Sequence, residues 1–425
     1  MRSETRRRKV AVRLFLWSWL LWLTTASAAL AAELPADIVA LTGREVPQLL
    51  GLPLADVSAT AIDAGSPTAV HVQIDQRTRG PDGRWQYVFD ADDTSVTTAT
   101  RGLGADDLVL LAADEGGERL PSPPTHTAEI EVVGAEGNSR WFYLGRGAPA
   151  ALPPLLSYDP VADRVRGSDY LLGFSHNGTP VIDTLILGDP QHAANILDRS
   201  KARLDVDLAL GMGHIARSED DVRIRTTGLH SSPLRIIREC EVRGRMLFGV
   251  YSPPVRDNFV FYAHGFVLPT TVRLTPTARF LTRSVTLRIS MDLRDAGGEL
   301  AFQSAPEISS PLAIDGHGGT RGGSQPIVWY LLRDGTTGLL GWLEAPDDIA
   351  RDVTVYYRDD RTHTDAPERS PGEVGDHGFL YRHRGGLPAG DLRLSTHAWI
   401  LHGTQLEQPA AELHALGSRP TVHVH

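Results

Sequence analysis

The sequence predicts a mainly β protein made of antiparallel β-sandwiches, with a large sandwich in its C-terminal part and few short helices. Apolar and polar residues alternate in many short stretches, of which "VTLRISMDL" (285–293) is the clearest. Such alternation is typical of antiparallel strands with one buried and one solvated face. Turn residues separate these stretches, as in "GPDG" (80–83) and "DAGGE" (295–299), and few segments have helical periodicity. These three observations together indicate layered sheets.

Residues 1–32 have the pattern of a secretory signal peptide. Five arginines and Lys9 flank the start of the apolar run "LFLWSWLLWL", and small residues with A-x-A spacing follow it. An uncleaved membrane anchor is the alternative, but the run is short for a span that needs about 20 apolar residues. We therefore expect cleavage of this segment, a periplasmic or secreted mature protein, and no membrane span after cleavage.

The charge of the mature chain argues against nucleic acid and anionic membranes as partners, and against an acidic glycan unless arginines gather in a groove. Removing residues 1–32 takes away six of the 42 basic residues and one of the 52 acidic residues, which leaves 36 against 51 and a formal charge of −15. An acidic exported protein is a poor match for nucleic acid or for an anionic membrane surface. Cys240 is the only cysteine, so no disulfide forms within the chain and the fold depends on its hydrophobic core. The oligomeric state stays open.

A Pro- and Ala-rich stretch at 149–160 divides the rest of the chain into two strand-rich regions, for which it is the expected linker. We expect an N-terminal β-sandwich at 33–148, because its size is close to the roughly 100 residues of a single sandwich. The region 161–425 is long enough for a large sandwich of long strands. Helices are expected only at 192–204 and 409–417.

An acidic loop between two expected strands is a candidate calcium site. Its carboxylates, within and after the stretch "FDADDTSVTTAT", are Asp90, Asp92, Asp93 and Asp106. Calcium binds several closely spaced oxygen ligands, but this loop has a serine where a sharply turning calcium loop has glycine. The alternative is an acidic turn that keeps a sheet edge soluble. His423 and His425 are a second metal candidate, for Zn²⁺ or Cu²⁺, and no other cofactor is expected.

Two sets of segments resemble known β-proteins. The first, "VQIDQR" with "DGRWQYVFD" and "GADDLVLLAAD", is similar to uncharacterised exported bacterial β-proteins. The second, "SSPLRIIRECEVRG" with "NFVFYAHGFVLP", resembles strands of the large supersandwiches of the galactose-mutarotase and polysaccharide-lyase type. The resemblance implies a fold class rather than an activity, because one fold hosts many functions.

Large sandwiches that handle sugars bind them on a concave sheet face, so we looked for reactive side chains on strand-like segments. Cleavage of an acidic polysaccharide by β-elimination needs a cation, a base and an acid, for which Arg, His and Tyr are suited. Arg235, Tyr262 and His264 are the candidate catalytic residues, since Tyr262 and His264 are two residues apart and would share a strand face. The alternative places Tyr262 in the core and His264 at a strand end.

Five further side chains are candidate substrate-binding residues: Arg238, Trp329, Tyr330, His377 and Trp399. Arg235 and Arg238 are three residues apart, so they point to opposite faces of a regular strand and at most one belongs to the site. The sequence leaves two functions open. One is an exported carbohydrate-handling protein that binds a polysaccharide or cleaves it as a lyase does. The other is a non-catalytic structural or assembly protein of the bacterial envelope.

Overall fold

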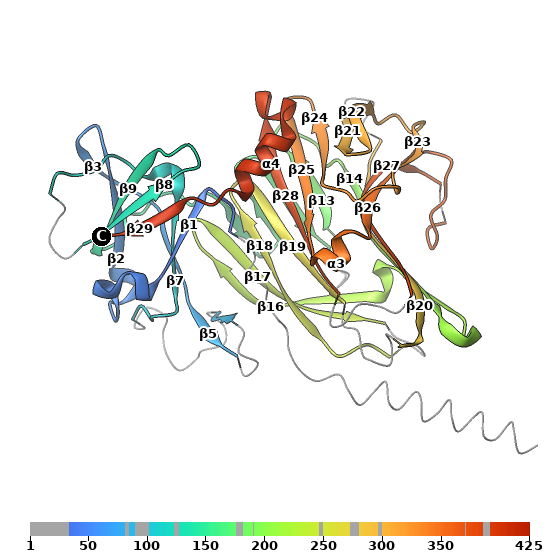
Figure 1. Cartoon of the computed structure of the whole chain (residues 1–425), viewed down its shortest axis with the longest axis horizontal. Helices are drawn as coiled ribbons and strands as arrows, with labels where there is room; N and C mark the ends of the chain where they lie inside the picture. The colour runs from blue at the N-terminus through green and yellow to red at the C-terminus, as the bar shows by residue number, and fades with distance from the viewer. Residues whose placement is uncertain are drawn as a thin grey trace, which may run out of the picture.

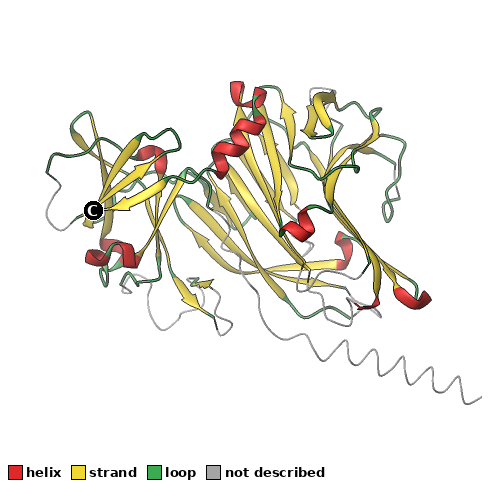
Figure 2. Cartoon of the chain, in the orientation of Figure 1, coloured by secondary structure: helices red, strands yellow, loops and turns green. Residues whose placement is uncertain are grey.

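The computed structural model describes residues 34–80, 85–89, 102–122, 127–175, 182–189, 191–245, 250–272, 280–295, 300–369, 371–385 and 392–425. Most regular structure in these ranges is antiparallel strand, and their α-helices are the short α3 (Asp347–Ala350) and α4 (Pro409–Gly417) (Figure 1; Figure 2). The predicted mainly β fold class is confirmed. None of the helices in these ranges is long and apolar enough to cross a bilayer. The expected signal peptide lies outside the described residues, so export stays a prediction.

Two large sheets form the body of the molecule. The six-stranded sheet contains, in spatial order, β15 (His214–Arg217), β14 (Leu197–Leu208), β20 (Thr282–Leu293), β27 (Glu373–Arg384), β26 (Val353–Asp360) and β23 (Gly319–Arg321). The nine-stranded sheet contains β16 (Val222–Ser231), β17 (Arg235–Gly244), β18 (Val255–Tyr262), β19 (Gly265–Val272), β28 (Leu392–His402), β25 (Thr337–Glu344), β24 (Trp329–Asp334), β21 (Leu300–Ala305) and β22 (Ile308–Ala313). The two sheets enclose one apolar core, which makes them a large sandwich.

Strand β20 illustrates how sequence alternation places side chains in this sandwich. Val285 and Leu287 pack in the core between the sheets. Arg288, Ser290 and Asp292 occupy the alternate positions and so point away from that core. We expected this outer face to be solvated, and that expectation is wrong: all three residues are buried, because residues 361–369 cover the face and contact Arg288 through Asp365.

Smaller sheets complete the molecule. A four-stranded sheet packs against the sandwich core and contains β10 (Ser157–Asp159), β11 (Arg164–Arg166), β12 (Tyr170–Phe174) and β13 (Ile182–Leu187). The N-terminal region has a three-stranded sheet of β1 (Ile38–Thr42), β7 (Leu108–Ala112) and β4 (Val72–Asp75). It also has a five-stranded sheet of β29 (Thr421–Val424), β8 (Ala128–Val133), β9 (Ser139–Arg146), β2 (Val57–Asp63) and β3 (Ser66–Ala69), and the hairpin of β5 (Arg77–Arg79) and β6 (Trp85–Tyr87).

The three-stranded sheet lies between two apolar cores. Val109 and Leu111 of β7 face the five-stranded sheet. Leu110 and Ala112 of the same strand face the nine-stranded sheet, where they pack with residues such as Tyr262. A strand that is covered on both faces needs an unbroken apolar sequence, which explains the run "LVLLA".

Of the two segments expected to be helical, one is a helix and the other is not. The segment 192–204 was expected to be helical, but its second half belongs to β14, because it pairs with β20 along its length. The helix expected at 409–417 is confirmed as α4.

After α4 the chain returns to the N-terminal region, where β29 pairs with β8 (Figure 1). The expected boundary at 149–160 stays a prediction, although the last strand of 161–425 belongs to an N-terminal sheet.

Candidate functional site

Charged side chains gather on the outer face of the six-stranded sheet, around the ammonium group of Lys201. This residue is one of only two lysines in the chain, and its side chain is fully buried. Its Nζ atom lies within 3.6 Å of five carboxylates, at 2.8 Å from Asp292, 3.2 Å from Glu368, 3.3 Å from Glu373, 3.5 Å from Asp376 and 3.6 Å from Asp365. We call this set, with the arginines that contact it, the Lys201 cluster.

A β-bulge places two of these carboxylates on one face. In a regular strand, Glu373 and Asp376 would point to opposite faces because they are three residues apart. The pairing of β26 with β27 shifts between Arg358 and Asp360, where β27 has one extra residue. Gly375 lies at this bulge with φ +57°, and a Cβ atom there would lie 2.7 Å from Ile314 Cγ2. The bulge therefore requires glycine and turns both acids toward Lys201.

Arginines from three strands complete the cluster. Arg203 of β14 donates to Glu368 at 2.8 Å and contacts Glu219. Arg288 of β20 donates to Tyr356 Oη at 2.6 Å and contacts Asp365. Arg358 of β26 donates to Glu373 Oε2 at 3.0 Å. The cluster members from residues 361–369 are partly exposed, whereas Lys201 and Asp376 are sealed from solvent.

Burial and charge determine which of these groups are ionised. Burial raises the pKa of Asp376 to about 7, although Lys201 and Arg288 oppose this shift. Burial also raises the pKa of Asp292 to about 6 against the effect of Lys201. Burial lowers the pKa of Lys201, but Asp376 and Asp292 raise it more, so that the pKa lies above its ordinary value. Lys201 is therefore a permanent cation, and neither oxygen of Asp376 has a hydrogen-bond partner among the described residues.

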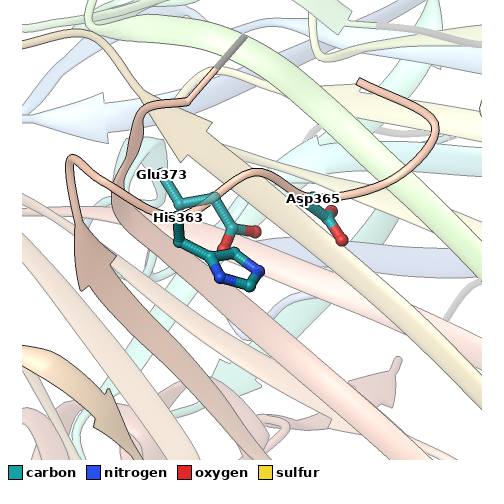
Figure 3. Close-up of side chains that lie close together, drawn as sticks. All are labelled: His363, Asp365 and Glu373. Carbon is teal, nitrogen blue, oxygen red and sulfur yellow. The ribbon is translucent and has the colours of Figure 1, made fainter. Parts of the chain in front are cut away.

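One corner of the cluster combines an imidazole with two carboxylates. His363, Asp365 and Glu373 each offer a ligand atom, and these atoms lie within 4.8 Å of one another (Figure 3). In Figure 3 the His363 ring lies beside the Glu373 carboxylate. His363 and Asp365 both belong to residues 361–369, the covering segment, whereas Glu373 belongs to β27. Among the described residues this is the one grouping of three such ligands at that spacing. It is the place where the chain could hold a metal ion.

A polar cleft opens beside the cluster, where the edge strands of the two large sheets meet. Its volume is about 530 Å³, and it is lined by Pro306, Glu307, Ile308, Ser309, Ser310, Leu312, Arg321, Gly322, Ser324 and Gln325. That volume falls within the roughly 300–1,000 Å³ of small-molecule sites. Thr320, the neighbour of Arg321 on β23, accepts a hydrogen bond from Arg358 Nε at 3.0 Å. This hydrogen bond links β23, which contributes Arg321 to the cleft, to the Lys201 cluster.

The second wall of the cleft is fixed by two local features. Glu307 Oε1 accepts hydrogen bonds from both the backbone N and the Oγ atom of Ser324, each at 2.7 Å. Gly322 has φ +84°, and a Cβ atom there would lie 2.3 Å from Val355 Cγ1. Only glycine allows the loop to pass this close to β26 in that conformation. These two features fix the backbone conformation of the loop that carries Arg321 and Ser324.

Two of the three predicted catalytic residues, Arg235 and Tyr262, are register partners on β17 and β18, but His264 does not share a strand face with them. Strand β18 ends at Tyr262, so His264 lies in the following turn and the expected common strand face is wrong. Tyr262 is buried in the core next to the N-terminal sheet. His264 is exposed by 45% and contacts Asp169 at 3.2 Å. Arg235 is buried and donates to Asp75 Oδ2 at 2.7 Å.

The predicted substrate-binding residues are buried in the interior rather than on a sugar-accessible face. Trp329 and Trp399 belong to the core beside Tyr262. Tyr330 lies in the main sandwich core, and His377 is fully buried with Nδ1 at 2.8 Å from the Gly375 carbonyl oxygen. Burial lowers the pKa of His377 to about 4, so it is neutral. Arg238 does point opposite to Arg235, as expected, and donates to Asp163 at 2.8 Å.

The predicted metal candidates have different outcomes. Asp90, Asp92 and Asp93 lie outside the described residues, so the calcium loop stays a prediction. Asp106 is described, and it pairs with Arg44 at 2.6 Å. At the C-terminus, His425 lies 3.4 Å from Glu131, and the rings of His423 and His425 are 6.5 Å apart. No three-ligand grouping forms at either place among the described residues.

Sequence reasoning missed the Lys201 cluster because its members have no local signature. On β20, a charged residue at every second position is also the pattern of an ordinary solvated face. The one available signal was composition: Lys201 stands nearly alone as a lysine in a chain whose other basic residues, Lys9 excepted, are arginines. The rarity of lysine in this chain was therefore the one sequence feature that singled out Lys201.

No family model matches the sequence, and no curated protein matches it. Among solved structures, the chain resembles an alpha-mannosidase from Enterococcus faecalis V583, with 9% identity, a TM-score of 0.47, and coverage of 92% of this chain and 44% of that one. A protein in the glycosyl hydrolase family 38 from Enterococcus faecalis has 9% identity, a TM-score of 0.45, and coverage of 91% and 44%. The chain thus spans less than half the length of these proteins.

A third similar structure is that of HI1317, with 12% identity, a TM-score of 0.32, and coverage of 59% of this chain and all of that one. Of the expected resemblance to galactose-mutarotase and polysaccharide-lyase sandwiches, the mainly β fold is confirmed by the strands of the chain itself, and the rest stays a prediction. Likenesses of this size carry no activity over to this chain.

Proposed function

We propose that this chain is an exported protein that binds a carbohydrate in the cleft between residues 306–312 and 321–325. The observation that carries the proposal is the cleft itself, whose volume of about 530 Å³ and exposed hydroxyl and guanidinium groups suit a short run of sugar units. Ser309 and Ser310 offer hydroxyl groups that pair with sugar hydroxyls, and the Ser324 hydroxyl, which donates to Glu307, can accept a hydrogen bond from the sugar. Arg321 offers a planar donor set that matches a carboxylate. An acidic oligosaccharide is therefore the preferred ligand.

Binding fits this cleft better than cleavage. β-Elimination needs an acid and a base next to the cation, but the described lining residues include neither tyrosine nor histidine. Hydrolysis uses two carboxyl groups, and the described lining residues offer one, that of Glu307. Its Oε1 atom is already engaged by Ser324. The lyase function that the sequence left open is thus not the one we favour.

A glycan panel tests this proposal. The full chain is titrated calorimetrically with neutral and uronic-acid oligosaccharides, and we expect tighter binding of the acidic ones. Arg321→Ala should weaken that binding about tenfold, which corresponds to about 1.4 kcal/mol. The matched control is Arg351→Ala, another exposed arginine that lies outside the cleft. A lack of binding across the panel would favour the envelope structural protein, and equal binding by Arg321→Ala would overturn the assignment of the sugar to this cleft.

Two further measurements complete the test. Incubation with polyuronates, while the absorbance of unsaturated sugar ends is followed, should give no signal, because we propose binding without cleavage. The mass of the mature protein should correspond to removal of about 30 residues, as expected for a cleaved signal peptide. A full-length N-terminus would contradict the export proposal but would leave the cleft proposal untouched.

A further inference from the structure

We infer that His363, Asp365 and Glu373 form a binding site for one divalent transition-metal ion of the Zn²⁺ or Mn²⁺ type. The ligand atoms of these residues already lie within 4.8 Å of one another (Figure 3). His363 Nε2 is 3.5 Å from Glu373 Oε2. An imidazole nitrogen with two carboxylates is a ligand set that such ions accept, whereas Ca²⁺ and Mg²⁺ prefer oxygen alone.

The three ligands differ in exposure in a way that suits an ion arriving from solvent. His363 is 37% exposed and Asp365 is 15% exposed, and both belong to the covering segment. Glu373 is buried and belongs to β27, so it is an anchored ligand. The ion would join the covering segment to the sheet, at the point where the segment crosses β26 and β27.

A second observation points to a missing cation. The cluster holds five carboxyl groups, which are Asp292, Asp365, Glu368, Glu373 and Asp376, against four cationic side chains, which are Lys201, Arg203, Arg288 and Arg358. Carboxyl groups therefore outnumber the cationic side chains in the cluster. Asp376 is fully buried, points at Lys201, and has no hydrogen bond to either carboxylate oxygen among the described residues. Its nearest cationic atom is Lys201 Nζ at 3.5 Å, which four other carboxyl groups share.

Arginines occupy positions that the ion would take. Arg358 Nη1 contacts both His363 Nε2 and Glu373 Oε2, and Arg288 contacts Asp365. Arg358 also donates through Nε to Thr320, so its guanidinium has a second anchor toward β23. Binding of the ion would release Nη1 from between His363 and Glu373 and leave that anchor in place. Arg358 therefore competes with the metal and lowers its apparent affinity.

Zinc titration of the chelator-treated full chain tests this inference by calorimetry. We expect one Zn²⁺ per chain and a rise in melting temperature on binding. His363→Ala should weaken binding at least about tenfold. The matched control is His214→Ala, because His214 also contacts two carboxylates, but through opposite ring nitrogens, Nε2 to Asp205 at 3.2 Å and Nδ1 to Asp207 at 3.0 Å. One ion cannot bridge that arrangement, so the control should bind Zn²⁺ like the parent.

Two variants keep the test independent of folding and of the glycan proposal. Arg358→Gln removes the competing cation and should bind Zn²⁺ more tightly than the parent. Arg321→Ala alters the cleft alone and should leave Zn²⁺ binding unchanged. The inference is overturned if the parent binds no Zn²⁺, or if folded His363→Ala binds it as well as the parent does.

Discussion

At the scale of single residues, the ion pair of Arg235 and Asp75 shows that an arginine chosen as a catalytic candidate has a structural partner. Both side chains are almost completely buried, where β17 meets the N-terminal strand β4. Gln73 donates to Asp75 Oδ1 at 2.6 Å, and its own Oε1 atom accepts from the Arg235 backbone N at 2.9 Å. The guanidinium is thus fully used in joining the two halves of the chain. The sequence identifies the arginine but not a partner 160 residues away.

Replacing Asp75 with asparagine should destabilise the protein severely. The change leaves Arg235 as a buried charge without its counter-ion, a loss that typically costs about 3–5 kcal/mol. Urea unfolding measures this as a lower midpoint. The control is Asp56→Asn, which breaks the exposed pair with Arg146, and we expect a loss of no more than about 1 kcal/mol there. Equal effects of the two changes would contradict the importance of the buried pair.

The same residue makes acid stability a separate prediction. Burial raises the pKa of Asp75, but Arg235 and then His230 lower it more, so that it falls from 3.8 to about 2. A carboxyl group with a depressed pKa stabilises the folded state above its unfolded pKa and loses this contribution as the pH falls through the folded value. Stability of the parent should therefore decline between about pH 4 and pH 2. Asp75→Asn should show a smaller decline over that interval, and a parallel decline would contradict this assignment.

At the scale of elements, β29 shows that alternation in sequence identifies a strand without identifying its sheet. The tail "TVHV" has the expected period of two, with Thr421 and His423 exposed and Val422 and Val424 partly buried against the N-terminal core. It pairs with β8, almost 300 residues earlier in the chain. Nothing in the local pattern distinguishes this pairing from one within the large sandwich. Sheet membership is set by long-range packing that periodicity does not contain.

The two faces of β29 give a matched pair of variants. Changing Val422 and Val424 to serine should destabilise the protein by about 2 kcal/mol, because each valine loses part of its apolar burial. Hydrogen exchange should rise along β8, whose edge is then less well covered. Changing Thr421 and His423 to serine should alter stability by no more than about 0.5 kcal/mol, as for other surface positions. Equal exchange rates in both variants would show that β29 does not stay paired in solution.

At the scale of the whole molecule, the sheets stack in layers from the five-stranded sheet through the three-stranded sheet to the large sandwich. The alternation of apolar and polar residues was enough to predict most strands and the mainly β fold class. The candidate site did not, because Lys201 and Glu373 are 172 residues apart and meet only when β14, β20 and β27 align. The aromatic residues chosen as a sugar platform were apolar enough to be buried as core. The polar cleft instead uses serines and one arginine that no pattern singled out.

A crystal structure of the full chain with a bound uronic-acid oligosaccharide tests the central claim most directly. We predict that the sugar lies between residues 306–312 and 321–325, with a carboxylate of the ligand paired to the Arg321 guanidinium and with hydroxyl groups bonded to Ser309, Ser310 or Ser324. A sugar bound elsewhere on the chain, or an empty cleft at concentrations that saturate binding in solution, would contradict the proposed function.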